Sequence, residues 1–509
     1  MIPIAQISWT SRSILARDEI RGTRAGRAPI YAARAPFKHL FPINEKRAPM
    51  AYESINPYTA ERVKEFVEHT DTEVEIAITK AQACFTAWKE TTFAERSAIL
   101  SKAANLLRHH TEKLARLITL EMGKLIADSR GEVALSADII DYYAQHAEAF
   151  LATEPLSPHS GQATIESCPI GVLFGIEPWN FPYYQLARFV APNLMAGNVV
   201  MVKHAPSVPQ CALAFVALFH EAGAPEGAYT NLFLSNDQAE RLIDDPRIKG
   251  VALTGSERAG SVVAAQAGKN LKKSTMELGG SDAFIVLEDA ELYKTVQWAV
   301  WGRMNNTGQC CVAAKRFIVV DSIADRFINK FQAELETLSP GDPSDASTTL
   351  GPLCSESALL HLLDQVKRSV AAGARVVLGG GRLNRKGAFM DPTILTDIKK
   401  GSPAYTEEFF GPVALFFRVA NEEEAIALAN DSKYGLGGSV FTSDIERGKR
   451  VAARIETGMV FVNHPTWTAP DLPFGGIKNS GYGRELSSQG IQEFINKKLI
   501  CVVPIDAPA

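Results

Sequence analysis

Between Thr72 and about Tyr143, apolar residues recur at three- and four-residue spacing. This spacing places them on one face of amphipathic helices. Gly123 follows "LEM" and is a residue type that commonly ends a helix. The pattern therefore predicts a helical region over this stretch, followed by Pro-, Gly- and Ser-rich sequence in which the alternation of "QATIESCPI" predicts a hairpin strand.

From Gly171 onward, short apolar runs alternate with helical segments. We expect strands at 171–176, 198–202, 229–234 and 250–253, and helices at 184–195, 208–223, 237–244 and 258–271. Strands and helices that alternate in this way form right-handed βαβ units around a parallel sheet. Such sheets bind their ligands at the carboxyl ends of the strands.

A second alternating stretch begins after "MELGG" (Met276–Gly280) and includes "AFIVLEDA", "KRFIVV", "ARVVLGG", "ALFFRVA" and "GMVFVN". It predicts a second α/β domain. The fold class is therefore α/β.

The composition adds several exclusions. The 509 residues are 46% apolar and 22% charged, with a formal net charge of −4, so no basic surface argues for nucleic acid as a partner. No run of about 18 apolar residues predicts a membrane span. The seven cysteines include no CxxC pair and no Cys/His cluster with metal-ligand spacing, so we expect reduced thiols, no metal and a cytoplasmic location.

Residues 1–50 differ from the rest, with nine Lys or Arg against three Asp or Glu. Arg-rich, acid-poor amino termini can direct proteins to an organelle matrix. A disordered tail, or a true start at Met50, would also explain this segment. We therefore leave it outside the predicted fold.

Three segments contain candidate catalytic groups. Asn180 in "EPWNFPYYQLAR" is a neutral amide donor of the kind that stabilises an oxyanion, or else a turn residue. Glu277 in "MELGG" has apolar neighbours that would raise its pKa toward that of a general base, or it is a buried structural carboxylate. "TGQCCVAAKR" supplies a candidate nucleophile in Cys310 or Cys311, which backbone N–H groups or a nearby cation could activate, although most cysteines are buried and inert.

Other segments suggest a phosphate-containing ligand. "LTGSERAG" (Leu253–Gly260) follows a predicted strand and opens a helix, where Ser256 and the helix N-terminus offer donors to a diphosphate. This signal is weak, and a plain strand–turn–helix junction would look the same. Lys203 ends a predicted strand, where it could reach a nucleotide or be solvated. "EEFFGPV" and "LPFGGIKNSGYGREL" are loops of the kind that often line active sites.

The order of "PWNFP", "TGS", "MELGG", "GQxC", "EEFFGPV" and "PFGGIKNSGYGRE" resembles that of the NAD(P)-dependent aldehyde dehydrogenase superfamily over about residues 54–500. Within it, "GQCCVAAKRFIV", "MELGGSDAFIVLEDAE", "NLMAGNVVMVKHAPSV" and "GRELSSQGIQEF" look most like bacterial succinate-semialdehyde dehydrogenases. The resemblance implies an enzyme that oxidises a small aldehyde to a carboxylic acid through a cysteine thioester.

The resemblance assigns Cys311 as the nucleophile, Asn180 with the Cys311 N–H as the oxyanion hole, and Glu277 as the base that activates water. It implies that eight further positions bind the dinucleotide: Trp179, Lys203, Gly255, Ser256, Gly260, Leu278, Glu408 and Phe410. Glu408 would bind the nicotinamide ribose. Pro206 stands where many NAD-preferring relatives have a Glu, so either NAD or NADP would fit, with Lys203 or His204 near a 2′-phosphate.

The implied domains are a basic extension at 1–50, a cofactor domain at 51–150 and 169–276, and a catalytic domain at 277–489. An oligomerisation arm at 151–168 and 490–509 would pair across a homodimer or homotetramer. For a carboxylated substrate, Arg188 matches a carboxylate-binding arginine and Thr468 could add a hydroxyl. A second arginine of some relatives is Asn305 here, and a structural ion pair is the alternative role for Arg188.

Several alternatives stay open. The substrate could be another aliphatic or aromatic aldehyde. A relative that passes the thioester to coenzyme A would generally lack the base, so Glu277 argues against it. A catalytically silent binding or structural protein on this fold would be expected to lose Cys311, Asn180 or Glu277, and all three are present.

Overall fold

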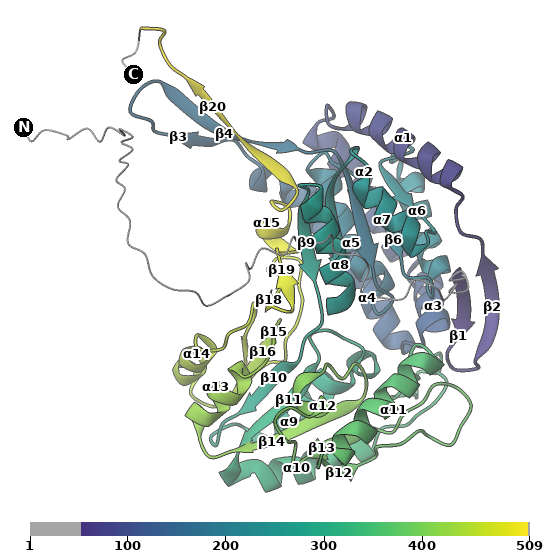
Figure 1. Ribbon diagram of the computed structural model, residues 1–509, viewed down its shortest axis with the longest axis vertical. Coiled ribbons are helices and arrows are strands. Elements are labelled where there is room, and N and C mark those ends of the chain that lie inside the picture. Colours follow the sequence, from purple (N-terminus) through teal and green to yellow (C-terminus); the bar gives the residue numbers. More distant parts are fainter. Residues whose placement is uncertain (1–51, 507–509) are drawn as a thin grey trace, which may run out of the picture. The chain divides into compact units, whose positions relative to one another are not determined.

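The structure is a computed structural model that describes residues 52–506 (Figure 1). The basic extension at 1–50 therefore lies outside the described residues. The predicted helical stretch forms four helices, α1 (Asp71–Trp88), α2 (Phe93–His109), α3 (Thr111–Met122) and α4 (Ile126–Phe150). Thr70 and Thr92 cap α1 and α2, each with a Glu three residues later that completes a capping box. Gly123 ends α3 in the left-handed conformation, as predicted.

A six-stranded sheet follows, in the order β19-β9-β8-β5-β6-β7. Its strands are β5 (Val172–Glu177), β6 (Val199–His204), β7 (Tyr229–Asn231), β8 (Ile248–Thr254), β9 (Lys273–Glu277) and β19 (Gly481–Tyr482). The connecting helices are α5 (Pro182–Met195), α6 (Pro209–Ala222), α7 (Asn236–Asp244) and α8 (Glu257–Lys269). β5 to β9 are parallel and almost wholly buried, whereas β19 arrives from the C-terminal part and runs antiparallel to β9.

The second alternating stretch forms a seven-stranded sheet in the order β12-β13-β14-β11-β10-β16-β17. Its strands are β10 (Asp282–Val286), β11 (Ala314–Val320), β12 (Arg375–Leu378), β13 (Thr393–Thr396), β14 (Val413–Val419), β16 (Gly438–Phe441) and β17 (Phe461–Val462). Its helices are α9 (Leu292–Met304), α10 (Asp321–Glu336), α11 (Glu356–Ala371), α12 (Pro403–Thr406), α13 (Glu422–Asn430) and α14 (Ile445–Ala452). Only β12 is antiparallel to its neighbour, and the two sheets confirm the predicted α/β class.

Three strands form a separate antiparallel sheet, which we call the arm: β3 (Glu154–Leu156), β4 (Gln162–Pro169) and β20 (Ile495–Val502). β20 pairs with all eight residues of β4, and Figure 1 shows these two distant segments side by side. Two short ladders complete the fold, β1 (Tyr52–Asn56) with β2 (Glu61–Phe66), and β15 (Tyr434–Gly435) with β18 (Ile477–Lys478). The short helix α15 (Ser487–Gly490) precedes the arm's last strand.

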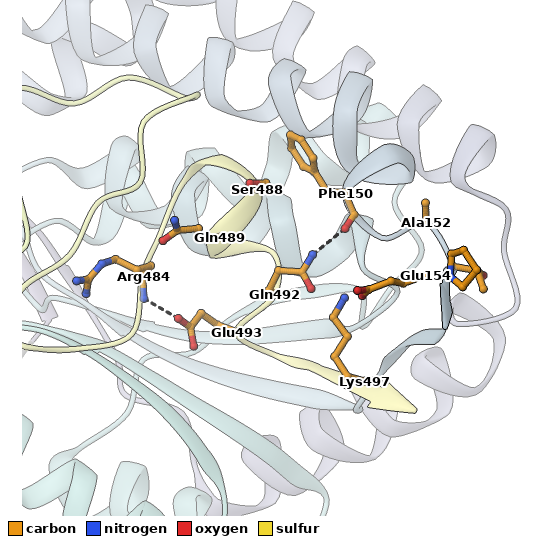
Figure 2. A pocket seen from close by; sticks show the side chains of 11 residues that line it. Phe150, Ala152, Glu154, Arg484, Ser488, Gln489, Gln492, Glu493 and Lys497 are labelled. Carbon is orange, nitrogen blue, oxygen red and sulfur yellow. Dashed lines mark hydrogen bonds between the residues drawn. The ribbon is translucent and has the colours of Figure 1, made fainter. Parts of the chain in front are cut away.

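An open hollow of about 800 Å³ lies at the root of the arm. Figure 2 shows its side chains, where Gln492 donates to the carbonyl of Phe150 at 2.7 Å and Glu493 accepts from the Arg484 backbone N–H at 2.7 Å. None of the predicted site residues lines this hollow. In residues 52–506, no helix is both long and apolar enough to cross a membrane.

The register of the six-stranded sheet sets up the site. Glu177 pairs with His204, Ile176 pairs with Leu253, and Thr254 pairs with Glu277. In parallel strands of matched register, side chains at equal positions project from the same face. His204, Glu177, Thr254 and Glu277 therefore form one row across the carboxyl ends of four strands, where ligands of such sheets bind.

Candidate active site

The segment before the two cysteines has an unusual backbone. Asn306 and Thr307 have φ values of 51° and 55°, and Gly308 has 77°. A side chain on Gly308 would place its Cβ 2.3 Å from the carbonyl oxygen of Gly411, so only glycine fits there. Arg303, which is fully buried, donates to the Gly308 carbonyl at 2.7 Å. Left-handed non-glycine residues persist only where surrounding contacts fix them, and here they orient the nucleophile segment.

Cys310 and Cys311 both line a cavity of about 330 Å³. The hydrogen bond between the two thiols lowers the pKa of Cys310 to about 7 and raises the pKa of Cys311, to which burial also contributes. Two thiols that interact this strongly titrate as a pair. Both thiols reach the cavity, and the resemblance described above implies that Cys311 is the nucleophile.

Asn180 lies beside this segment, as predicted. Its Nδ2 donates to the carbonyl of Gln309 at 3.2 Å, and its Oδ1 accepts from Gln185 Nε2 at 3.2 Å. Asn306 Nδ2 donates to the Asn180 backbone carbonyl at 2.8 Å, which links the two loops. Because an amide nitrogen carries two protons, one N–H of Asn180 remains for a substrate oxyanion.

Glu277 ends β9 and is only 3% exposed. Neither carboxylate oxygen has a hydrogen-bond partner among the described residues. Burial, with the neighbouring carboxylate of Glu485, raises the pKa of Glu277 well above its ordinary value, while Arg188 opposes the shift. A Cβ on Gly475 would lie 2.7 Å from Glu277 Oε1, so the glycine loop leaves room for this carboxylate.

Arg188 forms an ion pair, which is the alternative role given above for this residue. Its side chain is fully buried and forms an ion pair with Glu485, and it does not line the cavity. Nη1 donates to the Tyr184 hydroxyl at 3.1 Å and Nη2 donates to Thr254 Oγ1 at 3.0 Å. The Tyr184 hydroxyl is 3.0 Å from Thr468 Oγ1, and both of these residues do line the cavity. Arg188 therefore contacts the cavity lining through the Tyr184 hydroxyl and through Phe474, whose ring centroid is 4.8 Å from its guanidinium carbon.

The predicted dinucleotide positions gather at the carboxyl ends of the six-stranded sheet and on the loop before β14. The Trp179 and Phe410 rings meet edge to face with centroids 5.8 Å apart. Ser256 caps α8, whose N-terminus is suited to a phosphate group. A Cβ on Gly260 would lie 2.6 Å from Leu278, so the glycine allows strand and helix to pack closely. Gly255 donates its N–H to the Glu277 carbonyl at 2.9 Å, which links the end of β8 to the end of β9.

Two further groups bear on the fit of a dinucleotide. Lys203 is 6% exposed and forms no ion pair with residues of the described chain, and burial lowers its pKa to about 8. Its ammonium lies 5.7 Å from the centroid of the Tyr52 ring, and a nearly buried cation without an ion-pair partner suits a ribose hydroxyl or a phosphate. His204 is fully buried, with both ring nitrogens at hydrogen-bond distance from backbone carbonyls, and burial lowers its pKa to about 4. It is therefore neutral and cannot meet a 2′-phosphate.

Five side chains of the site were not predicted from the sequence: Tyr184, Gln185, Asn306, Lys315 and Glu485. Tyr184 and Gln185 lie on the first turn of α5, four and five residues after Asn180, so helical spacing could have indicated them. Glu485 lies in the loop "LPFGGIKNSGYGREL", but nothing in the local sequence connects it with Arg188.

Within residues 52–506, no group of three His, Cys, Asp or Glu side chains could hold a metal ion.

Comparison with known proteins finds close similarity to aldehyde dehydrogenases. Succinate-semialdehyde dehydrogenase (NADP+) of Deinococcus radiodurans is 51% identical over 453 residues, 89% of this chain and 95% of that protein. Succinate-semialdehyde dehydrogenase (NADP+) 1 of Mycobacterium tuberculosis is 45% identical over 456 residues, 89% of this chain and 100% of that protein. The crystal structure of succinic semialdehyde dehydrogenase from Streptococcus pyogenes in complex with NADP+ superposes with a TM-score of 0.88 and 47% identity, over 89% of this chain and 100% of that one.

The family model described as "Aldehyde dehydrogenase family" matches residues 43–500, nearly the whole chain. The thiol pair, Asn180 and Glu277 are groups of the kinds that such chemistry uses as nucleophile, oxyanion donor and base. The chain belongs to the aldehyde dehydrogenase family.

Proposed function

We propose that this protein oxidises succinate semialdehyde to succinate with NADP+ through a thioester on Cys311. Its relatives in Deinococcus radiodurans and Streptococcus pyogenes are succinate-semialdehyde dehydrogenases named with NADP+. The observation that carries the substrate assignment is the chain of contacts from Arg188 through the Tyr184 hydroxyl to Thr468 at the cavity.

The residues have distinct roles in the reaction. The Cys311 thiolate attacks the aldehyde carbon, and the resulting oxyanion accepts hydrogen bonds from Asn180 Nδ2 and the Cys311 N–H. A dinucleotide held by Lys203, Ser256 and Glu408 would supply the hydride acceptor. Loss of hydride from the former aldehyde carbon would re-form the carbonyl and leave a thioester on Cys311. Glu277 then removes a proton from water, whose oxygen attacks the thioester carbon, and the carboxylic acid leaves as the Cys311 thiolate re-forms.

The cavity would recognise the substrate carboxylate with neutral donors. Among its lining residues there is no Lys or Arg in the described part of the chain. Tyr184 and Thr468 offer hydroxyls, and the Arg188 guanidinium polarises the Tyr184 hydroxyl from behind. A hydroxyl that accepts from a cation donates more strongly to an anion, because linked hydrogen bonds reinforce one another.

The cofactor assignment rests on what surrounds the adenosine ribose. Pro206 places no carboxylate three residues after Lys203, so nothing at this position repels a 2′-phosphate. Lys203 is a cation without an ion-pair partner among the described residues. We therefore propose NADP+ as the preferred cofactor, with NAD+ accepted less well.

We also propose a homodimer or homotetramer that forms through the arm, in the cytoplasm. β20 is the outer strand of the arm and exposes Leu499, Ile500 and Val502. An exposed apolar edge strand needs a partner strand to satisfy its backbone groups. The two α/β units would serve as cofactor domain and catalytic domain, as the resemblance implies.

A second candidate substrate class follows from the aromatic cavity wall. Phe181, Trp301, Trp467 and Phe474 line the cavity, so an aromatic or longer aliphatic aldehyde would also fit. Transfer of the acyl group to coenzyme A is disfavoured by the presence of Glu277.

The decisive experiment measures kcat/KM for succinate semialdehyde, butanal and benzaldehyde with NADP+ and with NAD+. We expect the carboxylated aldehyde to exceed butanal by about 10- to 100-fold, the usual effect of one or two hydrogen bonds to a charge. Equal values for succinate semialdehyde and butanal would refute the substrate assignment, and a higher value for benzaldehyde would favour the second class.

A further inference from the structure

Lys315 is a fully buried cation four residues after Cys311, near the start of β11. Its ammonium group donates to the backbone carbonyl of Cys310 at 2.9 Å and to that of Cys311 at 2.5 Å. It also forms an ion pair with Glu408 Oε1 at 3.0 Å. These three acceptors use all three protons of the ammonium. A charged side chain is buried to this extent only when it is fully paired.

The acceptors of Lys315 belong to two different parts of the site. The two carbonyls are those of the thiol pair, whereas Glu408 lies on the loop before β14. Glu408 Oε1 also accepts from the Gly280 N–H at 3.1 Å, and a Cβ on Gly280 would lie 2.7 Å from the Cys311 carbonyl oxygen. Glu408, Gly280 and the nucleophile backbone are thus packed around one ammonium group.

We propose that Lys315 is a positioning residue that fixes the nucleophile backbone and stabilises the Cys311 thiolate, with Glu408 as the counter-charge that limits this effect. The inference deepens the proposed function, since it takes Cys311 as the nucleophile and Glu408 as a cofactor-binding residue. Lys315 touches neither substrate nor sulfur and acts through the backbone and the local field.

The charges around the thiol pair support this role. Lys315 lowers the pKa of both cysteines, and Arg188 from α5 also lowers the pKa of Cys311. The charge of Arg188 is balanced by its ion pair with Glu485, however. The charge of Lys315 is balanced less completely, because the Glu408 carboxylate also accepts a hydrogen bond from the Gly280 N–H. The other ionisable groups that face these residues include Asp282 on β10, Arg303 on α9, Glu277 on β9, and Tyr434 on β15 beside Glu408.

The test uses the full-length protein without cofactor or substrate, so it does not depend on the substrate assignment. In a Cys310→Ala parent, the rate of Cys311 alkylation by iodoacetamide is followed by mass spectrometry from about pH 5 to about pH 10, the range in which thiols titrate. We expect Lys315→Met to raise the apparent pKa of Cys311 by about one unit, which reduces alkylation about tenfold below that pKa.

Removal of the Glu408 charge should shift the Cys311 pKa in the opposite direction. Glu408→Gln should lower the apparent pKa of Cys311, because it leaves the Lys315 charge uncompensated. A purely structural role of Lys315 would not produce shifts of opposite sign.

Two further variants serve as controls. Arg316→Met removes the neighbouring buried cation, whose guanidinium binds the carbonyls of Ser281, Leu428 and Ala429, and it should leave the Cys311 pKa unchanged. Lys315→Arg retains the charge and should stay near the parent value. If Lys315→Met does not fold, the Cys311 pKa measured in the Glu408→Gln protein alone tests the proposal. A Glu408→Gln protein with an unchanged or raised Cys311 pKa overturns the proposal, as does a folded Lys315→Met protein without a shift.

Discussion

Asn180 donates from Nδ2 to the carbonyl of Gln309 at 3.2 Å, two residues before Cys311. This bond joins the loop after β5 of the six-stranded sheet to the cysteine segment, which precedes β11 of the seven-stranded sheet. Gln185 fixes the other end of the same amide. The remaining N–H is therefore oriented before any substrate arrives, which is the condition for electrostatic stabilisation of a transition state.

Asn180→Ala should lower kcat about 100- to 1000-fold, because an oxyanion donor is lost while the backbone bond to Asn306 is retained. Steady-state assays with the preferred aldehyde measure the effect. Asn193→Ala removes a buried amide at the far end of α5 and should leave kcat near the wild-type value. A comparable kcat loss in both variants would show that α5 stability, not the oxyanion contact, had changed.

Cys311→Ala should lower aldehyde oxidation by at least about a thousandfold, as expected for a nucleophile that acts within a catalytic unit. Cys310→Ala should keep most of the activity, although its loss removes the thiol–thiol hydrogen bond. Circular dichroism checks that both proteins are folded. Equal loss in the two variants would contradict the assignment of Cys311.

Glu277→Gln should slow deacylation more than hydride transfer, because only hydrolysis of the thioester needs a base. Stopped-flow absorbance should then show a rapid burst of reduced cofactor followed by slow turnover, and the acyl-enzyme should appear in intact mass spectra. Normal turnover after an unchanged burst would exclude Glu277 as the base.

The pH dependence of deacylation should shift when Glu485 is neutralised. Glu277 works as a base only when ionised, so deacylation rises with pH through its raised pKa. Glu485 raises that pKa and also engages Arg188, which lowers it. Glu485→Gln removes the negative charge that raises the Glu277 pKa, and it frees the Arg188 charge to lower that pKa further. The acidic limb of the pH profile should therefore move to lower pH. Single-turnover hydrolysis measured against pH tests this, and a shift to higher pH would contradict it.

Tyr184→Phe should reduce the preference for succinate semialdehyde over butanal by about 10- to 100-fold, because the hydroxyl that links Arg188 to the cavity is lost. The kcat/KM for butanal should be nearly unchanged, since the ring remains. A parallel fall for both aldehydes would mean that Tyr184 shapes the cavity without recognising the carboxylate.

Much of this architecture was predictable, because local patterns determine local structure. Apolar periodicity and buried runs of β-branched residues located the helices and parallel strands. Strand-end polar residues such as Glu277 and Lys203 were predictable because βαβ topology brings them to one edge of the sheet. The arm strands β4 and β20 pair over a sequence separation that no local pattern reveals.

The site was less predictable where it depends on pairs of distant residues. The sequence left two roles open for Arg188, a substrate carboxylate or a structural ion pair. In the structure Arg188 forms an ion pair with Glu485, and the Tyr184 hydroxyl lies between its guanidinium and the cavity. Lys315 reads as an ordinary polar residue at the start of a strand, and only the folded chain brings Glu408 against it. Asn306 and Thr307 adopt left-handed conformations because the contacts around them require it, which their residue types alone do not indicate.

The row of Glu177, Thr254 and Glu277 depends on the exact alignment of β5, β8 and β9. A shift of β9 by one residue would turn Glu277 to the opposite face of the sheet and replace it with Met276 or Leu278. Such a misaligned chain would keep its secondary structure and most of its burial, yet it could not hydrolyse a thioester. In refolding experiments, recovery of deacylation would therefore report correct strand alignment, which circular dichroism would not detect.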